Sequence, residues 1–159
     1  MKLVLGACVA CVVLLAGCGG PERNTTPASP VSKKTLAILQ RVQKKVPYTI
    51  TLPAYVPPGG RLVFVALQPQ LPGRGALELL YVGGKWRLQI NESLVHIKEP
   101  GVPKRVVKGM SLQELAPNQF HVNNILWNDP KTGVAYDVYG KYLPLTTLVR
   151  SLASLRKLP

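Results

Sequence analysis

Cysteine is missing from the whole chain after position 18. The sequence has three cysteines, and all of them lie near its start, at Cys8, Cys11 and Cys18. Residues 19–159 therefore cannot form a disulfide, a zinc–thiolate site or a cysteine nucleophile. A folded domain in this region must be held together by its core, and a hydrophobic fraction of 47% is ordinary for such a domain.

Histidine and acidic residues are also scarce, which limits the chemistry open to the chain. The two histidines, His96 and His121, lie in different segments and match no HExxH pattern, so we expect no metal site. Ser, His and Asp are all present, but no GxSxG motif accompanies them. Glu78 and Glu92 lie on the arms of one predicted hairpin region, yet each is more simply a solvent-facing residue than half of a glycosidase pair. The sequence therefore predicts a protein that is not an enzyme.

No hydrophobic run is long enough to cross a membrane. The longest, Leu3–Ala16, has roughly 15 residues, and a spanning helix needs about 20. Lys2 precedes this run and small residues end it, which is the order of regions in a secretory signal. We therefore expect residues 1–17 to be a signal peptide that is cleaved between Gly17 and Cys18.

The last four residues of this region, Leu15-Ala16-Gly17-Cys18, resemble the bacterial lipobox. The resemblance implies that Cys18 carries covalent diacylglycerol, can also carry an N-acyl chain, and needs no other cofactor. Each buried methylene contributes about 0.8 kcal/mol, so two or three acyl chains would anchor the protein. The expected location is the extracytoplasmic face of the cell membrane. The alternative is an ordinary cleaved signal with an incidental cysteine.

The stretch after Cys18 reads as a tether. Residues 18–31 are rich in Gly, Pro, Thr, Asn and Ser and show no hydrophobic periodicity. A dozen such residues would hold a domain about 20 Å from its anchor on average. Residues 32–159 then form a single predicted domain, since the 142 residues left after cleavage suit one domain.

The chain is strongly basic. Its 20 Lys and Arg residues outnumber 7 acidic residues, and the net charge falls from +13 to +12 when Lys2 is removed. Such a field favours anionic partners, which outside the cytoplasm are anionic lipids and wall polymers rather than nucleic acid. The alternative is a solvated, soluble surface, because no basic run exceeds two residues.

Two amphipathic helices are predicted, one near each end of the domain. Ser32 can cap a helix over residues 33–46, and Pro47 would end it. This helix packs on the sheet or, alternatively, rests on the membrane. The second helix begins at Pro144. Its apolar residues recur at helical spacing, at Leu145, Leu148, Val149, Leu152 and Leu155.

Between the helices, hydrophobic alternation predicts strands. They cover residues 48–52, 62–67, 76–82, 86–91, 105–108, 120–127 and 134–139, while residues 112–115 read as a helical turn. Gly83-Gly84-Lys85 predicts a hairpin. The predicted fold class is α+β, a curved antiparallel sheet of about six strands with an N-terminal and a C-terminal helix packed on one face.

Short motifs give a family resemblance over roughly residues 47–155. They are Leu52-Pro53-Ala54-Tyr55-Val56-Pro57-Pro58-Gly59, Tyr81, Leu126-Trp127, Gly133-Val134-Ala135-Tyr136, Ser151-Leu152 and Ser154-Leu155. Their order resembles an uncharacterised domain of exported lipoproteins and membrane-tethered regulators of Gram-positive bacteria. That domain is similar in layout to curved-sheet lipoprotein-carrier and sigma-regulator domains. This sequence departs from it at Pro144–Thr147, which lacks an acidic cap, and over residues 92–119. The resemblance supplies no catalytic residues.

Aromatic side chains are the remaining candidates for a binding site. A curved sheet could hold an apolar ligand or a peptide on its concave side, and the candidate ligand-facing residues are Tyr81, Trp86, Trp127 and Tyr136. The predicted function is therefore a binding or sensing module for an envelope protein, a wall polymer or a lipid-like ligand. The alternatives are a lipoprotein hydrolase and a solute receptor, although the chain is short for a two-lobed receptor. The sequence does not determine an oligomeric state.

Overall fold

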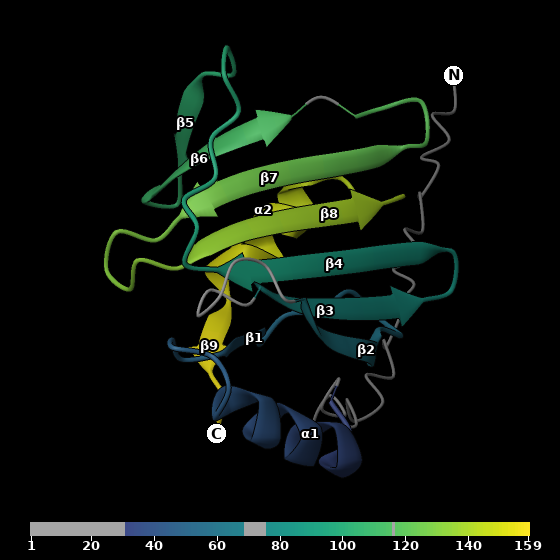
Figure 1. Ribbon diagram of the computed structural model, residues 1–159. Coiled ribbons are helices and arrows are strands. Elements are labelled where there is room, and N and C mark those ends of the chain that lie inside the picture. Colours follow the sequence, from purple (N-terminus) through teal and green to yellow (C-terminus); the bar gives the residue numbers. More distant parts are fainter. Residues whose placement is uncertain (1–30, 69–75, 116) are drawn as a thin grey trace, which may run out of the picture.

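The computed structural model describes residues 31–68, 76–115 and 117–159 (Figure 1). The predicted signal peptide, Gly17, Cys18 and nearly all of the tether lie outside these residues. The helices are α1 (Lys33–Gln43) and α2 (Leu145–Ala153). The strands are β1 (Thr51–Pro53), β2 (Arg61–Gln68), β3 (Ala76–Gly83), β4 (Trp86–Ser93), β5 (Lys104–Val107), β6 (Met110–Leu115), β7 (Val122–Asn128), β8 (Ala135–Lys141) and β9 (Leu155–Lys157). Within the described residues, neither helix has the length and hydropathy to cross a membrane.

The architecture is broadly α+β, as predicted, but the number of strands and the positions of the helices differ from the prediction. Seven strands form one antiparallel sheet in the order β2-β3-β4-β8-β7-β6-β5, and β1 pairs with β9 in a separate two-stranded sheet. The prediction of about six strands in one sheet was therefore wrong. Figure 1 shows α2 behind the large sheet, whereas α1 lies beyond its β2 edge.

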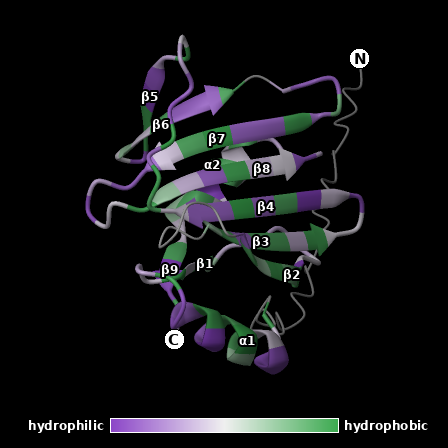
Figure 2. Cartoon of the chain, viewed as in Figure 1, coloured by the Kyte–Doolittle hydropathy of each residue, from purple (hydrophilic) through white to green (hydrophobic). Residues whose placement is uncertain are grey.

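The core lies between α2 and one face of the large sheet, which we call the inner face. Strand alternation points Leu79, Ile90, Val138 and Ile125 to this face, where each is fully buried. The same alternation is visible as changing colour along β4 in Figure 2. The opposite, outer face carries polar side chains that include Glu78, Asn91 and Asp137, which are paired across β3, β4 and β8.

The two helices are positioned by different devices. α1 starts at the predicted cap, because the Ser32 side chain accepts a hydrogen bond from the Thr35 N–H (3.1 Å). It ends at Gln43 rather than at residue 46, since the Gln43 side chain bonds the Tyr48 carbonyl (2.7 Å) and the Ile50 N–H (2.8 Å) and turns the chain. Pro144 is the N-cap of α2 rather than its first residue.

The segment around residues 110–115 is a strand, so the predicted helical turn there was wrong. Met110 and Leu112 face the core, while Gln113 is buried on the outer face. Its side-chain amide donates to the Glu99 carbonyl (2.8 Å) and also to that of Val102, within the segment that connects β4 to β5. This connection crosses the outer face, as Figure 1 shows, and covers the ends of β8, β7 and β6.

Candidate functional site

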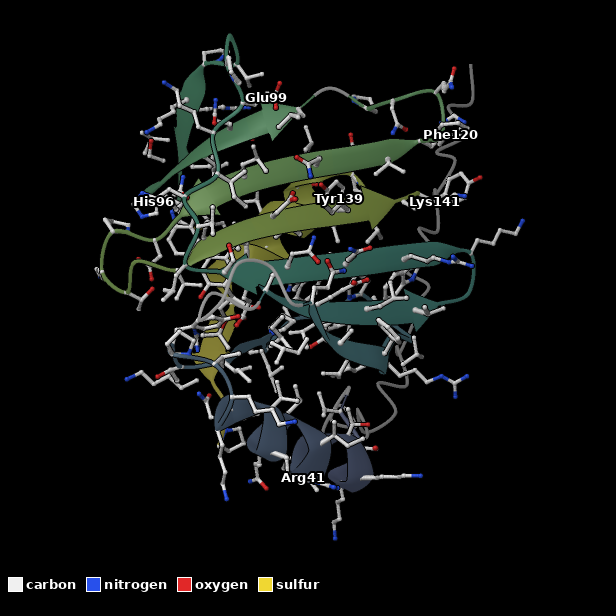
Figure 3. All side chains as sticks on the ribbon, viewed as in Figure 1. Arg41, His96, Glu99, Phe120, Tyr139 and Lys141 are labelled. Atoms are coloured by element: carbon white, nitrogen blue, oxygen red, sulfur yellow. The ribbon has the colours of Figure 1, made fainter. Side chains whose placement is uncertain are left out.

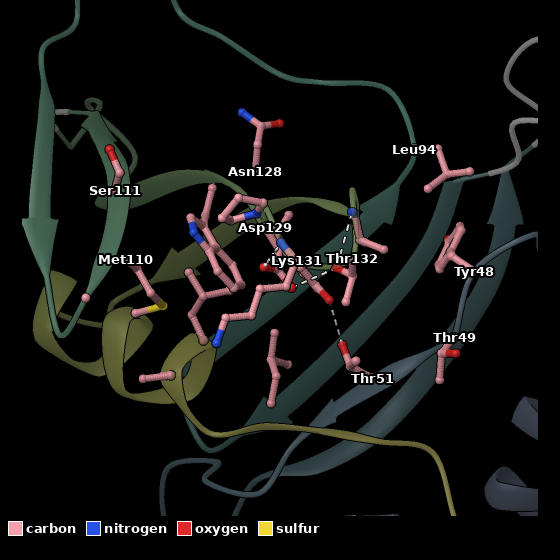
Figure 4. A pocket seen from close by; sticks show the side chains of 18 of the residues that line it. Tyr48, Thr49, Thr51, Leu94, Met110, Ser111, Asn128, Asp129, Lys131 and Thr132 are labelled. Atoms are coloured by element: carbon pink, nitrogen blue, oxygen red, sulfur yellow. Dashed lines mark hydrogen bonds between the residues drawn. The ribbon is translucent and has the colours of Figure 1, made fainter.

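An open groove with a volume of about 1140 Å³ lies at one end of the inner face (Figure 4). Its walls come from segments far apart in the chain: the β1–β9 ribbon, the β5–β6 hairpin, the β7–β8 loop and the end of α2. The volume is slightly above the range of about 300–1,000 Å³ that is common for small-molecule sites. The groove is therefore large enough for a small amphiphile or a short segment of polypeptide.

The floor of the groove is aromatic and apolar. Trp127 of β7 and Tyr136 of β8 are directly paired in the sheet, and their rings stack with centroids 5.2 Å apart and an interplanar angle of 20°. Val134, Met110 and Leu152 complete this surface. Since aromatic rings present much apolar area with little conformational freedom, this floor is suited to a hydrocarbon chain or an apolar side chain.

The rim of the groove is basic. Four lysines line it, at Lys104, Lys108, Lys131 and Lys157, and among its described residues the only acidic one is Asp129. The Asp129 carboxylate accepts hydrogen bonds from the Lys131 N–H (3.0 Å) and the Thr132 hydroxyl (2.7 Å), which shapes the β7–β8 loop. A ligand that carries negative charge at the mouth of the groove would therefore be favoured.

A buried acid, Glu92, lies behind the groove, so the expectation that this residue faces solvent was wrong. The Glu92 carboxyl group is fully buried and accepts hydrogen bonds from the Thr51 hydroxyl (2.6 Å) and the Thr51 N–H (3.2 Å). Burial raises the pKa of Glu92 to about 8, although the Thr51 hydrogen bonds lower the pKa. Glu92 is thus mainly uncharged at neutral pH, and the charge of the site is confined to its rim.

One hydroxyl connects the groove to this acid. The Thr51 hydroxyl lies 2.6 Å from Glu92 Oε1 and 3.2 Å from the Tyr136 hydroxyl, and either hydroxyl of the second pair can be the donor. Burial also raises the pKa of Tyr136, which keeps its proton in place. The chain Tyr136–Thr51–Glu92 therefore fixes the orientation of the ring that forms half of the aromatic floor.

The structure brings together two of the four predicted ligand-facing aromatics. Trp127 and Tyr136 line the groove, while Tyr81 is fully buried in the core and Trp86 lies at the other end of β4. A Cβ at Gly60 or Gly83 would collide with the Trp86 ring, so these glycines make room for it. Contact with a ligand stays a prediction for all four.

Among the residues that the structure describes, the carboxylates and histidines considered in the sequence analysis do not come together as a hydrolytic centre. Glu78 and Glu92 lie on opposite faces of the sheet, since Glu78 pairs with Asn91 and Glu92 pairs with Leu77. The Asp137 carboxylate accepts from Asn124 (2.6 Å) and Tyr139 (2.7 Å) on the outer face, and the exposed His121 stacks on Tyr142 instead. Within residues 31–68, 76–115 and 117–159, no cluster of His, Cys, Asp and Glu could hold a metal ion.

The lysine rim and Thr51 were not among the predicted site residues. The four lysines are separated by up to 53 positions in sequence, from 104 to 157, and none belongs to a recognisable motif. The one available signal was the excess of basic residues, which predicts an anionic partner without locating its site.

Comparison with known proteins gives two partial structural matches. The crystal structure of MucB in complex with MucA(peri) is 19% identical, with a TM-score of 0.44 over 67% of this chain and 36% of that one. The complex of Pseudomonas aeruginosa MucA and MucB gives 19% identity and a TM-score of 0.44 over 69% of this chain and 35% of that one. This chain thus spans about a third of their length. No model of a protein family and no curated protein matches the chain.

Proposed function

We propose that the protein is a non-enzymatic binding module of the cell envelope, anchored to the membrane by lipid on Cys18, that holds an anionic amphiphile in the groove. The lipobox-like sequence Leu15–Cys18 supports the anchor and the extracytoplasmic location. The observation that supports the ligand class best is the combination of a stacked Trp127–Tyr136 floor with four lysines on the rim.

The charge distribution favours a lipid-like ligand over a neutral apolar one. The floor is uncharged, because the acid behind it is buried and its pKa is raised to about 8. The hydrocarbon part of the ligand would cover Trp127 and Tyr136, and its acidic group would reach the lysines at the mouth. Exposed ion pairs of this kind contribute modestly, about 0.2–1 kcal/mol each, so most affinity would come from apolar burial.

A fluorescence titration tests this proposal. A soluble chain of residues 31–159, with its fold checked by circular dichroism, is titrated with dodecyl phosphate below its micellar concentration. The matched ligand is dodecylphosphocholine, which has the same hydrocarbon chain but no net charge. We expect saturable binding that alters Trp127 emission, with higher affinity for dodecyl phosphate.

Paired charge variants locate the site. Lys108→Gln with Lys131→Gln should weaken dodecyl phosphate binding roughly two- to fivefold for each lysine removed. Arg87→Gln with Lys141→Gln changes the net charge equally at the far end of the sheet and should leave the affinity unchanged. Equal affinity for both ligands, or equal loss in both variants, would contradict the proposed site.

A further inference from the structure

Three basic residues lie in one row across the outer face of the sheet, at the end opposite the groove. Arg61 pairs with Val82, Val82 with Arg87, Arg87 with Lys141, and Lys141 with Val122, so the five residues form one line across five strands. Directly paired like charges destabilise a sheet. In the described part of the chain, the one ion pair lies elsewhere, between Arg105 and Glu114. The Arg87–Lys141 pair thus has no compensating carboxylate there.

Exposed aromatic rings border this row. Phe120 is 61% exposed and Tyr142 is 56% exposed, although both are large apolar side chains. The His121 ring stacks on Tyr142 with centroids 5.6 Å apart, and Lys141 Nζ lies 5.4 Å above the Tyr142 ring. Figure 3 shows Phe120 and Lys141 at one end of the molecule, and His96 at the other.

The backbone holds these rings at the surface in an unfavourable conformation. His121 and Tyr142 have φ angles of 58° and 57°, a left-handed region that residues other than glycine rarely adopt. The Tyr142 N–H donates to the His121 carbonyl (3.0 Å), which ties the two positions together. Such strain often accompanies a functional surface.

We propose that this basic-aromatic end, consisting of Arg61, Lys85, Arg87, Phe120, Lys141 and Tyr142, rests on a bilayer that contains anionic phospholipid. Basic side chains are attracted to such a surface, and aromatic rings settle at its headgroup level. The inference rests on the envelope location proposed above but not on the groove ligand. In this orientation the groove faces away from the bilayer and stays open to its ligand.

Lysine footprinting tests the docking with the full chain. The chain is reconstituted through its apolar N-terminal segment into vesicles of phosphatidylcholine alone, or with about 30% phosphatidylglycerol, and treated with a membrane-impermeant acylating reagent. Mass spectrometry then gives a labelling rate for each lysine. Lys85 and Lys141 should react about threefold or more slowly in anionic vesicles, and high salt should restore their rates. The groove lysines Lys104 and Lys131 are internal controls and should not change.

Three double variants separate the docking surface from general charge. Two of them should remove the protection of Lys85: the double variant Phe120→Ser/Tyr142→Ser and the double variant Arg87→Gln/Lys141→Gln. Lys104→Gln with Lys108→Gln should retain it. Unchanged Lys85 labelling between the two vesicle types, or equal slowing of the groove lysines, would overturn the proposal. Protection by soluble poly(glycerol phosphate) but not by vesicles would also overturn it, in favour of a polymer site. Groove affinity is measured without vesicles, so the two proposals can fail separately.

Discussion

At the scale of single residues, Glu92 is the most unusual group of the described structure. A fully buried carboxyl with only Thr51 as a side-chain partner is held in its protonated form by desolvation, and its pKa rises to about 8. Below about pH 4.5 the folded and unfolded chains both keep this proton. Between that pH and 8 only the folded chain keeps it, so proton loss favours unfolding as the pH rises.

The stability of the fold should therefore fall between pH 5 and pH 8. One such proton contributes a slope of at most about 1.4 kcal/mol per pH unit to the free energy of unfolding. Urea denaturation at pH 5, 6, 7 and 8 measures this slope. Glu92→Gln cannot ionise, so its curve should be flatter and its stability at pH 8 higher than that of the parent chain.

A matched control is Glu78→Gln, which removes a carboxylate from the outer face of the neighbouring strand. This variant should keep the pH dependence of the parent. The account of Glu92 would be wrong if Glu92→Gln and Glu78→Gln gave the same pH profile.

At the scale of elements, the contact between α2 and β8 depends on a glycine. A Cβ on Gly140 would collide with Leu148 and approach the Leu143 Cβ to 3.1 Å. Leu148 is fully buried, so it has little room to yield. This close approach sets the position of the whole helix over the sheet.

Gly140→Ala should destabilise the fold by about 1–3 kcal/mol, through overpacking. Leu148→Ala should cost about 2–5 kcal/mol through a cavity. Leu148→Ala removes the side chain with which a Cβ at position 140 would collide. The double variant should therefore lose less stability than the sum of the two single losses. Thermal and urea unfolding measure all three, and strict additivity would show that the two residues do not share this space.

α1 provides a second test at this scale, because it is attached mainly through one side chain. Leu39 is the only residue of α1 that is buried, and Ile38 beside it is 37% exposed. Leu39→Ala should lower the free energy of unfolding by about 2–5 kcal/mol. Ile38→Ala should lower it far less; equal losses would place the contact of α1 elsewhere.

Elements with strong local signals were predicted well from sequence. The β3–β4 hairpin follows from Gly83-Gly84-Lys85 and the clean alternation after it, and α2 follows from its apolar stripe. Two cases failed for physical reasons. Residues 112–115 are too few to distinguish a period of 2 from one of 3.6. The first predicted strand, 48–52, shrinks to Thr51–Pro53 because its partner is β9, a pairing across about 100 residues that no local pattern reveals.

At the scale of the whole molecule, the groove could be predicted only in part. Trp127 and Tyr136 were recognisable as aromatics on strands, but Tyr81 and Trp86 have the same local pattern and do not line the groove. The difference is set by the register between strands and by where α2 and the β1–β9 ribbon leave the inner face uncovered. The lysine rim depends on three separate segments, the β5–β6 hairpin, the β7–β8 loop and β9, which meet only in the folded chain.

The basic charge is therefore divided between two ends of the molecule with different proposed roles. Lys108→Gln with Lys131→Gln should weaken ligand binding and leave vesicle protection intact, while Arg87→Gln with Lys141→Gln should do the reverse. Measuring both properties on both variants tests this division. If either double variant lost both ligand binding and vesicle protection, the two ends would instead belong to one continuous basic surface.

The most direct test of the groove is to locate the ligand against the two tryptophans. Selective labelling of the Trp86 and Trp127 indole rings in residues 31–159 allows intermolecular nuclear Overhauser effects from dodecyl phosphate to both rings to be measured in one sample. The account predicts that the hydrocarbon chain gives strong effects to Trp127, which lines the groove, and none to Trp86, at the opposite end of the sheet. Effects to Trp86 alone, or to neither ring under saturating conditions, would contradict it.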